Sequence, residues 1–151
     1  MRLFNRGVVI FGAAALIVGG VWYLASLPDV PESEILSRRG LHWHAKLEIF
    51  VNGEKEQIPA NIGLGITHNP IHTHEADDVI HLEFSGIVRK QDMELGKFFD
   101  IWNKPFSEEQ IFAYRNGPDG TVKMFVNGLP SMEFRRYAMK DGDKIEIRYE
   151  K

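Results

Sequence analysis

The sequence predicts an α+β protein in which an N-terminal transmembrane helix precedes a small domain with a mostly antiparallel or mixed β-sheet, hairpins and one main helix. Three observations support this prediction. Apolar and polar residues alternate over residues 41–49 of the segment 41–51, which is the pattern of a half-buried strand. Residues 95–102 follow the i, i+3, i+4, i+7 spacing of an amphipathic helix. Residues 7–27 carry no charge and are long enough to cross a bilayer core, for which about 20 apolar residues suffice.

Residues 1–27 are expected to form a cytoplasmic tip and a transmembrane signal-anchor. Arg2 and Arg6 precede the apolar run, and because positively charged flanks stay in the cytoplasm, the rest of the chain is predicted to lie outside it. Trp22 and Tyr23 suit the far membrane interface. A cleaved signal peptide is the alternative, although its apolar region would be only about 7–15 residues long. Both interpretations give an extracytoplasmic domain, and the signal-anchor makes it a single-pass protein of the cell membrane.

Residues 28–39 are expected to be a linker, because they are polar and Pro28 and Pro31 oppose helix continuation. The folded domain is then predicted to comprise residues 40–151, which is long enough for one core. These residues contain 14 Lys and Arg against 18 Asp and Glu and no basic stripe, so nucleic acid is not an expected partner. The chain has no cysteine, which excludes disulfides, thiolate zinc sites and cysteine nucleophiles.

The first strand of the domain is expected over residues 41–51. Its odd-numbered positions are apolar, while His42 and His44 lie at even-numbered positions and therefore share the polar face. Asn52-Gly53 follows, and this pair is a strong hairpin signal because both residues tolerate a positive φ. A return strand is expected near residues 56–59.

A second strand is expected over residues 79–84, with His81 and Glu83 on its polar face. The main helix is expected over residues 93–102, with Asp92 as its N-cap, and the Asn-Lys-Pro sequence that follows ends it.

The C-terminal third is expected to be a short helix followed by three strands. Residues 107–110 have the form of a capping box and predict the helix. Residues 122–126 and 131–135 are expected to pair around the turn at Asn127-Gly128, and the last strand is expected over residues 144–150.

All six histidines lie between residues 42 and 81. They occur in three groups, and each group pairs coordinating side chains two residues apart. Because the side-chain period of a strand is two, each pair projects from one face. Imidazole is the commonest protein ligand for late first-row metals, so the pattern predicts a metal site. The candidate ligands are His42, His44, His72, His74, His81 and Glu83, and His68, which is nearest to a loop, is the weakest candidate.

Several imidazoles with a carboxylate and no sulfur suit Cu(II), Zn(II) or Ni(II), and Cu(II) or Zn(II) is the first choice. Cu(I) is disfavoured because Met93, Met124, Met132 and Met139 fall outside the histidine region. About one equivalent of metal is expected, with the five paired histidines as a ligand pool, because four-coordinate sites predominate for zinc.

Six motifs spread over most of the domain carry a resemblance. They are His-Trp-His-Ala at 42–45, Val-Asn-Gly at 51–53, Ile-Pro-Ala-Asn-Ile-Gly at 58–63, Ile-His-Thr-His at 71–74, Ile-His-Leu-Glu at 80–83 and Leu-Gly-Lys-Phe-Phe-Asp-Ile-Trp at 95–102. Together they resemble an uncharacterised family of membrane-anchored bacterial and archaeal proteins. The resemblance supports the architecture and the grouping of the motifs, and it implies no reaction. The C-terminal stretch with its Asp-Gly-Asp turn also weakly resembles the closing part of β-grasp proteins.

Three classes of function follow from these patterns. The first is a membrane-anchored, extracytoplasmic, histidine-rich metal-binding protein. The second is a metal-dependent hydrolase or oxygenase in which three histidines hold the ion and Glu75, Asp77 or Glu83 acts as general base. The third is a protein-interaction module without metal, in which the histidines form a polar groove or a pH-responsive surface. The sequence does not decide whether the protein is an enzyme, and it identifies no protein partner.

Overall fold

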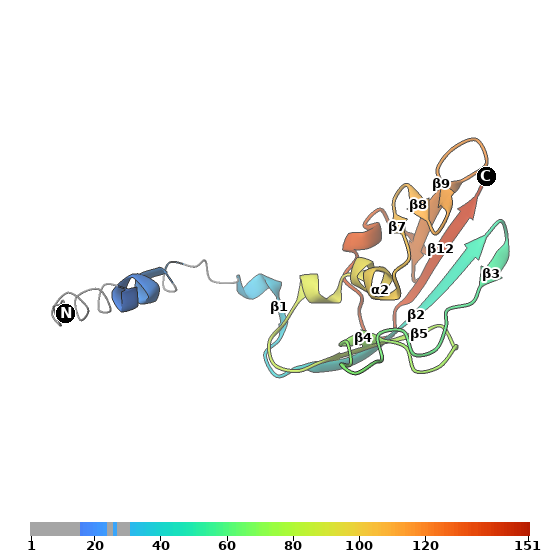
Figure 1. The fold of residues 1–151 in the computed structure, drawn as a ribbon. Coiled ribbons are helices and arrows are strands. Elements are labelled where there is room, and N and C mark those ends of the chain that lie inside the picture. Colours follow the sequence, from blue (N-terminus) through green and yellow to red (C-terminus); the bar gives the residue numbers. More distant parts are fainter. Residues whose placement is uncertain (1–15, 24–25, 27–30) are drawn as a thin grey trace, which may run out of the picture. The chain divides into compact units, whose positions relative to one another are not determined.

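The computed structural model of the protein describes residues 16–23, 26 and 31–151. The chain divides into two compact units, which are Met1–Pro31 and Glu32–Lys151 (Figure 1). In the first unit, residues 16–23 are helical and their large apolar side chains are exposed. The predicted membrane span, residues 7–27, falls mostly outside the described residues. Among those that are described, no helix has the length and apolar character needed to cross a membrane.

The second unit begins earlier in the chain than the predicted boundary at Gly40. It opens with a 3₁₀ helix, η1 (Glu32–Glu34), and β1 (Ile35–Ser37), which pairs antiparallel with β6 (Val88–Arg89). This pairing makes residues 32–39, which were expected to be linker, part of the folded unit. Gly40 then turns the chain with a φ of +83°, and a Cβ at this position would overlap the carbonyl oxygen of Phe84.

The main sheet has seven strands and is mixed. Its order is β11-β10-β12-β2-β5-β4, and β3 pairs with the far end of β2. β12 runs parallel to β2, while the other neighbours are antiparallel. The strands are β2 (Leu41–Val51), β3 (Glu54–Glu56), β4 (Ile71–His72), β5 (Val79–Phe84), β10 (Thr121–Val126), β11 (Leu129–Pro130) and β12 (Lys144–Glu150). An α+β fold with a mixed sheet is therefore confirmed.

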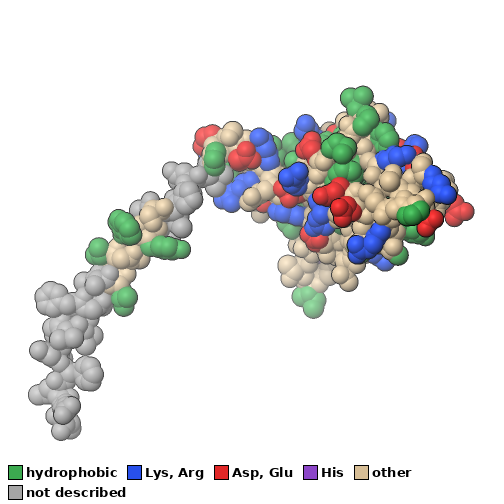
Figure 2. Space-filling view, turned by 90° about the horizontal axis from the view of Figure 1, so that it is seen from above, with side chains coloured by type: hydrophobic (Ala, Val, Ile, Leu, Met, Phe, Trp, Pro, Cys, Tyr) green, Lys and Arg blue, Asp and Glu red, His purple; other side chains and the backbone are tan. Residues whose placement is uncertain are grey.

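One face of this sheet forms the core with the helix α2 (Leu95–Trp102), which lies against it in Figure 1. Leu47 and Ile49 of β2 and Phe98 and Phe99 of α2 are fully buried in the same apolar cluster. The alternation along β2 therefore directs its apolar residues into the core, as predicted, and leaves its polar residues on the opposite face. On the surface that Figure 2 presents, acidic and basic side chains intermix with apolar ones.

The start of the helix differs from the prediction. Residues 90–93 form a 3₁₀ helix, η2 (Lys90–Met93), and α2 begins only at Leu95, after Glu94. The Asp92 carboxylate accepts a hydrogen bond from the backbone N–H of Arg89 at 2.8 Å, so it stabilises η2 and does not cap α2. Asn103 ends the helix as predicted, in the left-handed conformation at a φ of 56°.

Two further predictions in the C-terminal half are wrong. The capping-box sequence opens no helix, because β7 (Phe106–Ser107), β8 (Gln110–Ile111) and β9 (Tyr114–Arg115) form a small antiparallel sheet. The Ser107 hydroxyl accepts a hydrogen bond from the N–H of Glu109 at 3.1 Å, so it stabilises the hairpin turn instead.

The return strand expected over residues 131–135 is also replaced. Only β11 pairs with β10, and a 3₁₀ helix, η3 (Phe134–Arg136), follows. Phe134 is buried in the core, so the chain leaves the sheet edge in order to bury this ring. In the first hairpin, β3 lies closer to the turn than residues 56–59, because pairing resumes at Glu54 directly after the two-residue turn.

Candidate metal centre

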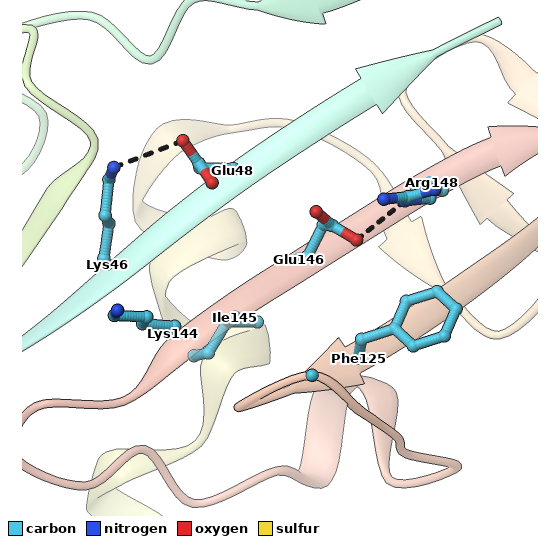
Figure 3. A pocket seen from close by; sticks show the side chains of 8 residues that line it. Lys46, Glu48, Phe125, Lys144, Ile145, Glu146 and Arg148 are labelled. Atoms are coloured by element: carbon cyan, nitrogen blue, oxygen red, sulfur yellow. Dashed lines mark hydrogen bonds and ion pairs between the residues drawn. The ribbon is translucent and has the colours of Figure 1, made fainter. Parts of the chain in front are cut away.

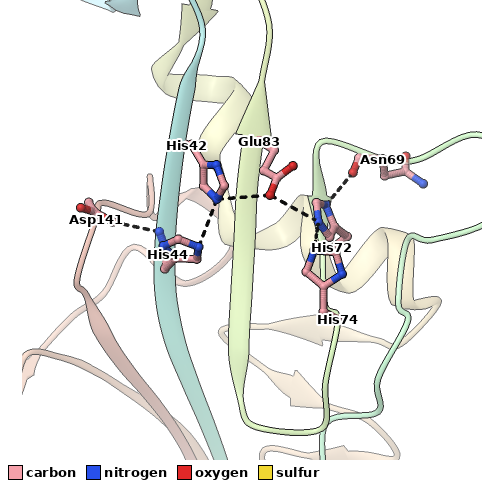
Figure 4. A network of polar contacts seen from close by, with 7 residues as sticks. All are labelled: His42, His44, Asn69, His72, His74, Glu83 and Asp141. Carbon is pink, nitrogen blue, oxygen red and sulfur yellow. Dashed lines mark hydrogen bonds and ion pairs between the residues drawn. The ribbon is translucent and has the colours of Figure 1, made fainter.

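The register of three neighbouring strands brings histidines that are distant in sequence into one row. His44 on β2 lies directly opposite His81 on β5, and His81 lies opposite His72 on β4. Two residues further along, on the same face, His42 lies opposite Glu83. Directly opposed residues on one face have Cβ atoms about 4.5–5.5 Å apart, so these side chains are held in contact by the backbone pairing itself. Figure 4 shows how His42, His44, His72, His74 and Glu83 approach one another across the strands.

The six predicted ligands form two overlapping groups. The first is His72, His74, His81 and Glu83, and the second is His42, His44 and His81. Within each group, one ligand atom per residue lies within 4.8 Å of all the others. His81 is the central ring, with centroid distances of 4.7 Å to His44, 4.5 Å to His74 and 5.5 Å to His72. His68 belongs to neither group.

Each predicted histidine pair has the spacing that a single metal ion requires. The Nε2 atoms of His42 and His44 are 3.2 Å apart, and those of His72 and His74 are also 3.2 Å apart. Two imidazole nitrogens bound to one tetrahedral Zn(II), at about 2.0–2.1 Å each, lie roughly 3.3 Å from each other. Either pair therefore has the geometry of two adjacent corners of a coordination tetrahedron.

The tautomer of His72 is determined by its surroundings. Its Nδ1 lies 2.9 Å from the backbone oxygen of Asn69. Because a carbonyl oxygen only accepts hydrogen bonds, Nδ1 carries the proton, and Nε2 presents its lone pair toward His74. Such a second partner, which orients a ligating imidazole, is typical of protein metal sites. No sequence pattern indicates the role of Asn69, because this contact depends on the path of the loop before β4.

Thr73, between the two histidines, anchors this segment from the core side. It is fully buried, and its hydroxyl donates to the carbonyl of Pro59 at 2.9 Å and accepts from the N–H of Ile62 at 3.0 Å. These bonds tie residues 72–74 to the loop after β3 and hold His72 and His74 on the opposite side. The sequence signal for this anchor was a threonine between two histidines, the second of which lies just after the end of β4.

His81 contains a nitrogen that the protein does not satisfy. Its Nδ1 is buried, and it has no hydrogen-bond partner among the described residues. Leaving a buried polar group unpaired costs about 1–3 kcal/mol. The ring lies among three other imidazoles. In the tautomer in which Nδ1 carries the lone pair, a metal ion is a partner that would satisfy this nitrogen.

Burial favours the neutral form of the two central rings. Desolvation lowers the pKa of His72 below its usual value, and the Asn69 carbonyl and Glu83 oppose this only in part. Desolvation also lowers the pKa of His81, and the neighbouring His44 and His74 lower it further, because nearby positive charges repel a second one. Neutral imidazole is the form that coordinates metal.

The second histidine pair, His42 and His44, is more exposed, and the turn at residues 141–143 holds its backbone in place. The side chain of His42 is 60% exposed, whereas that of His72 is only 4% exposed. The backbone N–H of His44 donates to the Asp141 carboxylate at 2.9 Å, and its carbonyl accepts from the N–H of Gly142 at 2.8 Å. The Asp-Gly-Asp turn before β12 therefore positions His44, a role that the sequence did not reveal.

Glu83 lies between the two pairs. Its Oε1 is 3.2 Å from Nε2 of His42 and 4.0 Å from Nε2 of His72. The other carboxylates considered as general bases belong to neither ligand group. Asp77 instead accepts a hydrogen bond from the N–H of Val79 at 3.1 Å, at the start of β5. Of the three acidic candidates, only Glu83 lies among the histidines.

A hollow of about 540 Å³ lies farther along the same polar face, over β2, β10 and β12 (Figure 3). Four of its charged side chains pair with one another: Lys46 with Glu48 at 3.2 Å, and Arg148 with Glu146 at 2.7 Å. It contains none of the candidate ligands. The histidine groups therefore form a separate site on the sheet surface.

Comparison with known proteins yields no relative: no family model matches the chain, and neither a curated protein nor a solved structure is significantly similar to it. The resemblances of the sequence motifs therefore remain predictions, and the evidence for function is the geometry of the site residues.

Proposed function

We propose that the protein is a membrane-anchored, extracytoplasmic, histidine-rich metal-binding protein, and that its principal ligands are His72, His74 and His81. The observation that carries this proposal is the buried, unpartnered nitrogen of His81 beside a histidine pair at coordinating distance. A row of contacting imidazoles does not stabilise a sheet surface, because neighbouring rings repel one another when they are protonated. A metal ion coordinated by the neutral rings would replace this repulsion with favourable bonds.

Cu(II) or Zn(II) is the metal that fits the donor set best. The groups offer imidazole nitrogen and one carboxylate oxygen, with no thiolate or thioether, and such ligands suit these ions better than Ca²⁺, Mg²⁺ or Cu(I). Three protein nitrogens leave a fourth tetrahedral position, which Glu83 or a water molecule would take. The extracytoplasmic, cell-membrane location rests on the apolar run of residues 7–27 and the arginines that precede it.

The proposal is tested on the full chain, purified in detergent without a histidine tag. Elemental analysis and calorimetric titration with Zn(II) and Cu(II) should show saturable binding at pH 7.5. The variant His72→Ala/His74→Ala should lose this binding. His68→Ala is the matched control, because His68 lies in the same region but in neither ligand group. Weak, non-saturating binding by the wild type, or equal binding by the double variant, would refute the proposal.

A further inference from the structure

The candidate site has more ligands than one ion uses. Five imidazoles and one carboxylate are present, whereas zinc sites are almost always four-coordinate. The six side chains also do not converge on one point, since the two histidine pairs belong to different groups that share only His81. A single ion bound at one pair therefore leaves the other pair, at the same 3.2 Å spacing, without a role.

The ligands divide between two positions, with Glu83 between them. On the β4 side, His72 and His74 lie next to His81, and Glu83 belongs to the same group. On the β2 side, Nε2 of His42 is 3.2 Å from Nε2 of His44 and also 3.2 Å from Oε1 of Glu83. Each position then has three protein ligands, which is the number found in zinc sites that keep one coordination place open.

We infer that the cluster is a dinuclear centre, which rests on the proposed metal-binding function. His72, His74 and His81 hold the first ion, and His42, His44 and Glu83 hold the second. Glu83 lies between them, since its Oε1 is also 4.0 Å from His72 Nε2, so the carboxylate is placed to bridge the two ions. In proteins that bind two metal ions side by side, the ions are about 3.5–4 Å apart.

The two positions differ in burial, and this difference determines the order of filling. The first is the more enclosed, because the side chain of His72 is 4% exposed and its tautomer is set by Asn69. The second is open to solvent, because the side chain of His42 is 60% exposed. A second divalent cation is also repelled by the first, although the negative charge of Glu83 between them weakens the repulsion. The second ion is expected to bind about ten- to a hundredfold more weakly than the first.

Copper titration of the full chain in detergent, followed by electron paramagnetic resonance and native mass spectrometry, tests the inference. The first equivalent of Cu(II) should give the spectrum of an isolated ion with full spin intensity. The second should give a coupled pair, with loss of integrated intensity per copper and a half-field transition. His68→Ala should behave like the wild type. Glu83→Gln, which keeps the shape but removes the charge, should weaken the second step more than the first, because Glu83 is one of three ligands of the second ion.

The variant His42→Ala/His44→Ala should stop at one equivalent and show only the isolated-ion spectrum. Both histidines are exposed, and circular dichroism checks that the variant is folded. Wild-type saturation at one equivalent would overturn the dinuclear centre and leave the proposed function intact. A second equivalent without spin coupling would overturn it equally, since that ion would be bound elsewhere. Absence of any saturable binding would overturn both proposals.

Discussion

Metal should stabilise the folded domain by an amount that can be worked out in advance. A ligand that binds only the folded state at a hundredfold excess over its Kd adds about 2.7 kcal/mol to the free energy of unfolding. The entropy of unfolding is about 2.1 cal/mol/K per residue, so for the unit Glu32–Lys151, of roughly 120 residues, it is about 0.25 kcal/mol/K. Zn(II) at that excess should therefore raise Tm by about 10 °C.

The metal-induced stabilisation should disappear in acid, and the direction of this pH dependence follows from His72 and His81. The pKa values of His72 and His81 are lowered in the folded state from an ordinary value of 6.5. As pH falls through about 6.5, the unfolded chain therefore takes up protons before the folded state does. The stability that these rings contribute is fully present above pH 6.5 and declines below it. Protons also compete with metal for the imidazoles, so the metal-induced shift in Tm should shrink as pH falls toward 5.

Melting curves followed by circular dichroism at pH 7.5 and pH 5, with and without Zn(II), measure both effects. The wild type should show the shift only at pH 7.5, and His68→Ala should match it. His72→Ala/His74→Ala should lose most of the shift while still unfolding cooperatively. An equal metal-induced shift in the wild type and the double variant would show that these two histidines are not the centre of the site.

Three further predictions concern the framework. Phe98→Ala should lower the free energy of unfolding by about 3–5 kcal/mol in urea titrations, because the ring is fully buried, and an unchanged midpoint would contradict its place in the core. Tyr137→Phe should cost about 1.5–3 kcal/mol by the same assay, since the hydroxyl donates to the buried Asp143 carboxylate at 2.6 Å; a loss below 0.5 kcal/mol, on the order of a surface change, would refute this. Thr73→Val should reduce metal affinity about 10- to 100-fold in calorimetry, because it removes the hydrogen bond to Pro59 that helps to hold the His72–His74 pair; unchanged affinity would argue against that role.

Local pattern predicted the long elements well, and the reason is physical. The bounds expected for residues 41–51, 79–84 and 144–150 are those of β2, β5 and β12, because the alternation of apolar and polar residues along most of each segment favours burial of a single face. Short elements were less predictable. The same capping residues serve a helix or a hairpin turn, so the turn after β7 was mistaken for a helix start, and only the packing of Phe106 and Phe134 in the core selected the hairpin and η3.

The pairs within the candidate site were also determined locally. His42 and His44 share a face because they are two residues apart in a strand, and the same holds for His81 and Glu83. Periodicity along one strand, however, carries no information about which strand lies beside it.

The tertiary structure determines which strands lie side by side in the sheet and in which register they pair. It placed His81 between His44 and His72, put Glu83 opposite His42, and formed the loop contacts of Asn69 and Thr73. A shift of one residue between β2 and β5 would move one strand's histidines out of the row, because successive side chains point to opposite faces. By itself, then, the sequence determined which side chains could coordinate and which pairs share a strand face. Only the packing of the core, which selects the strand register, decided that they meet.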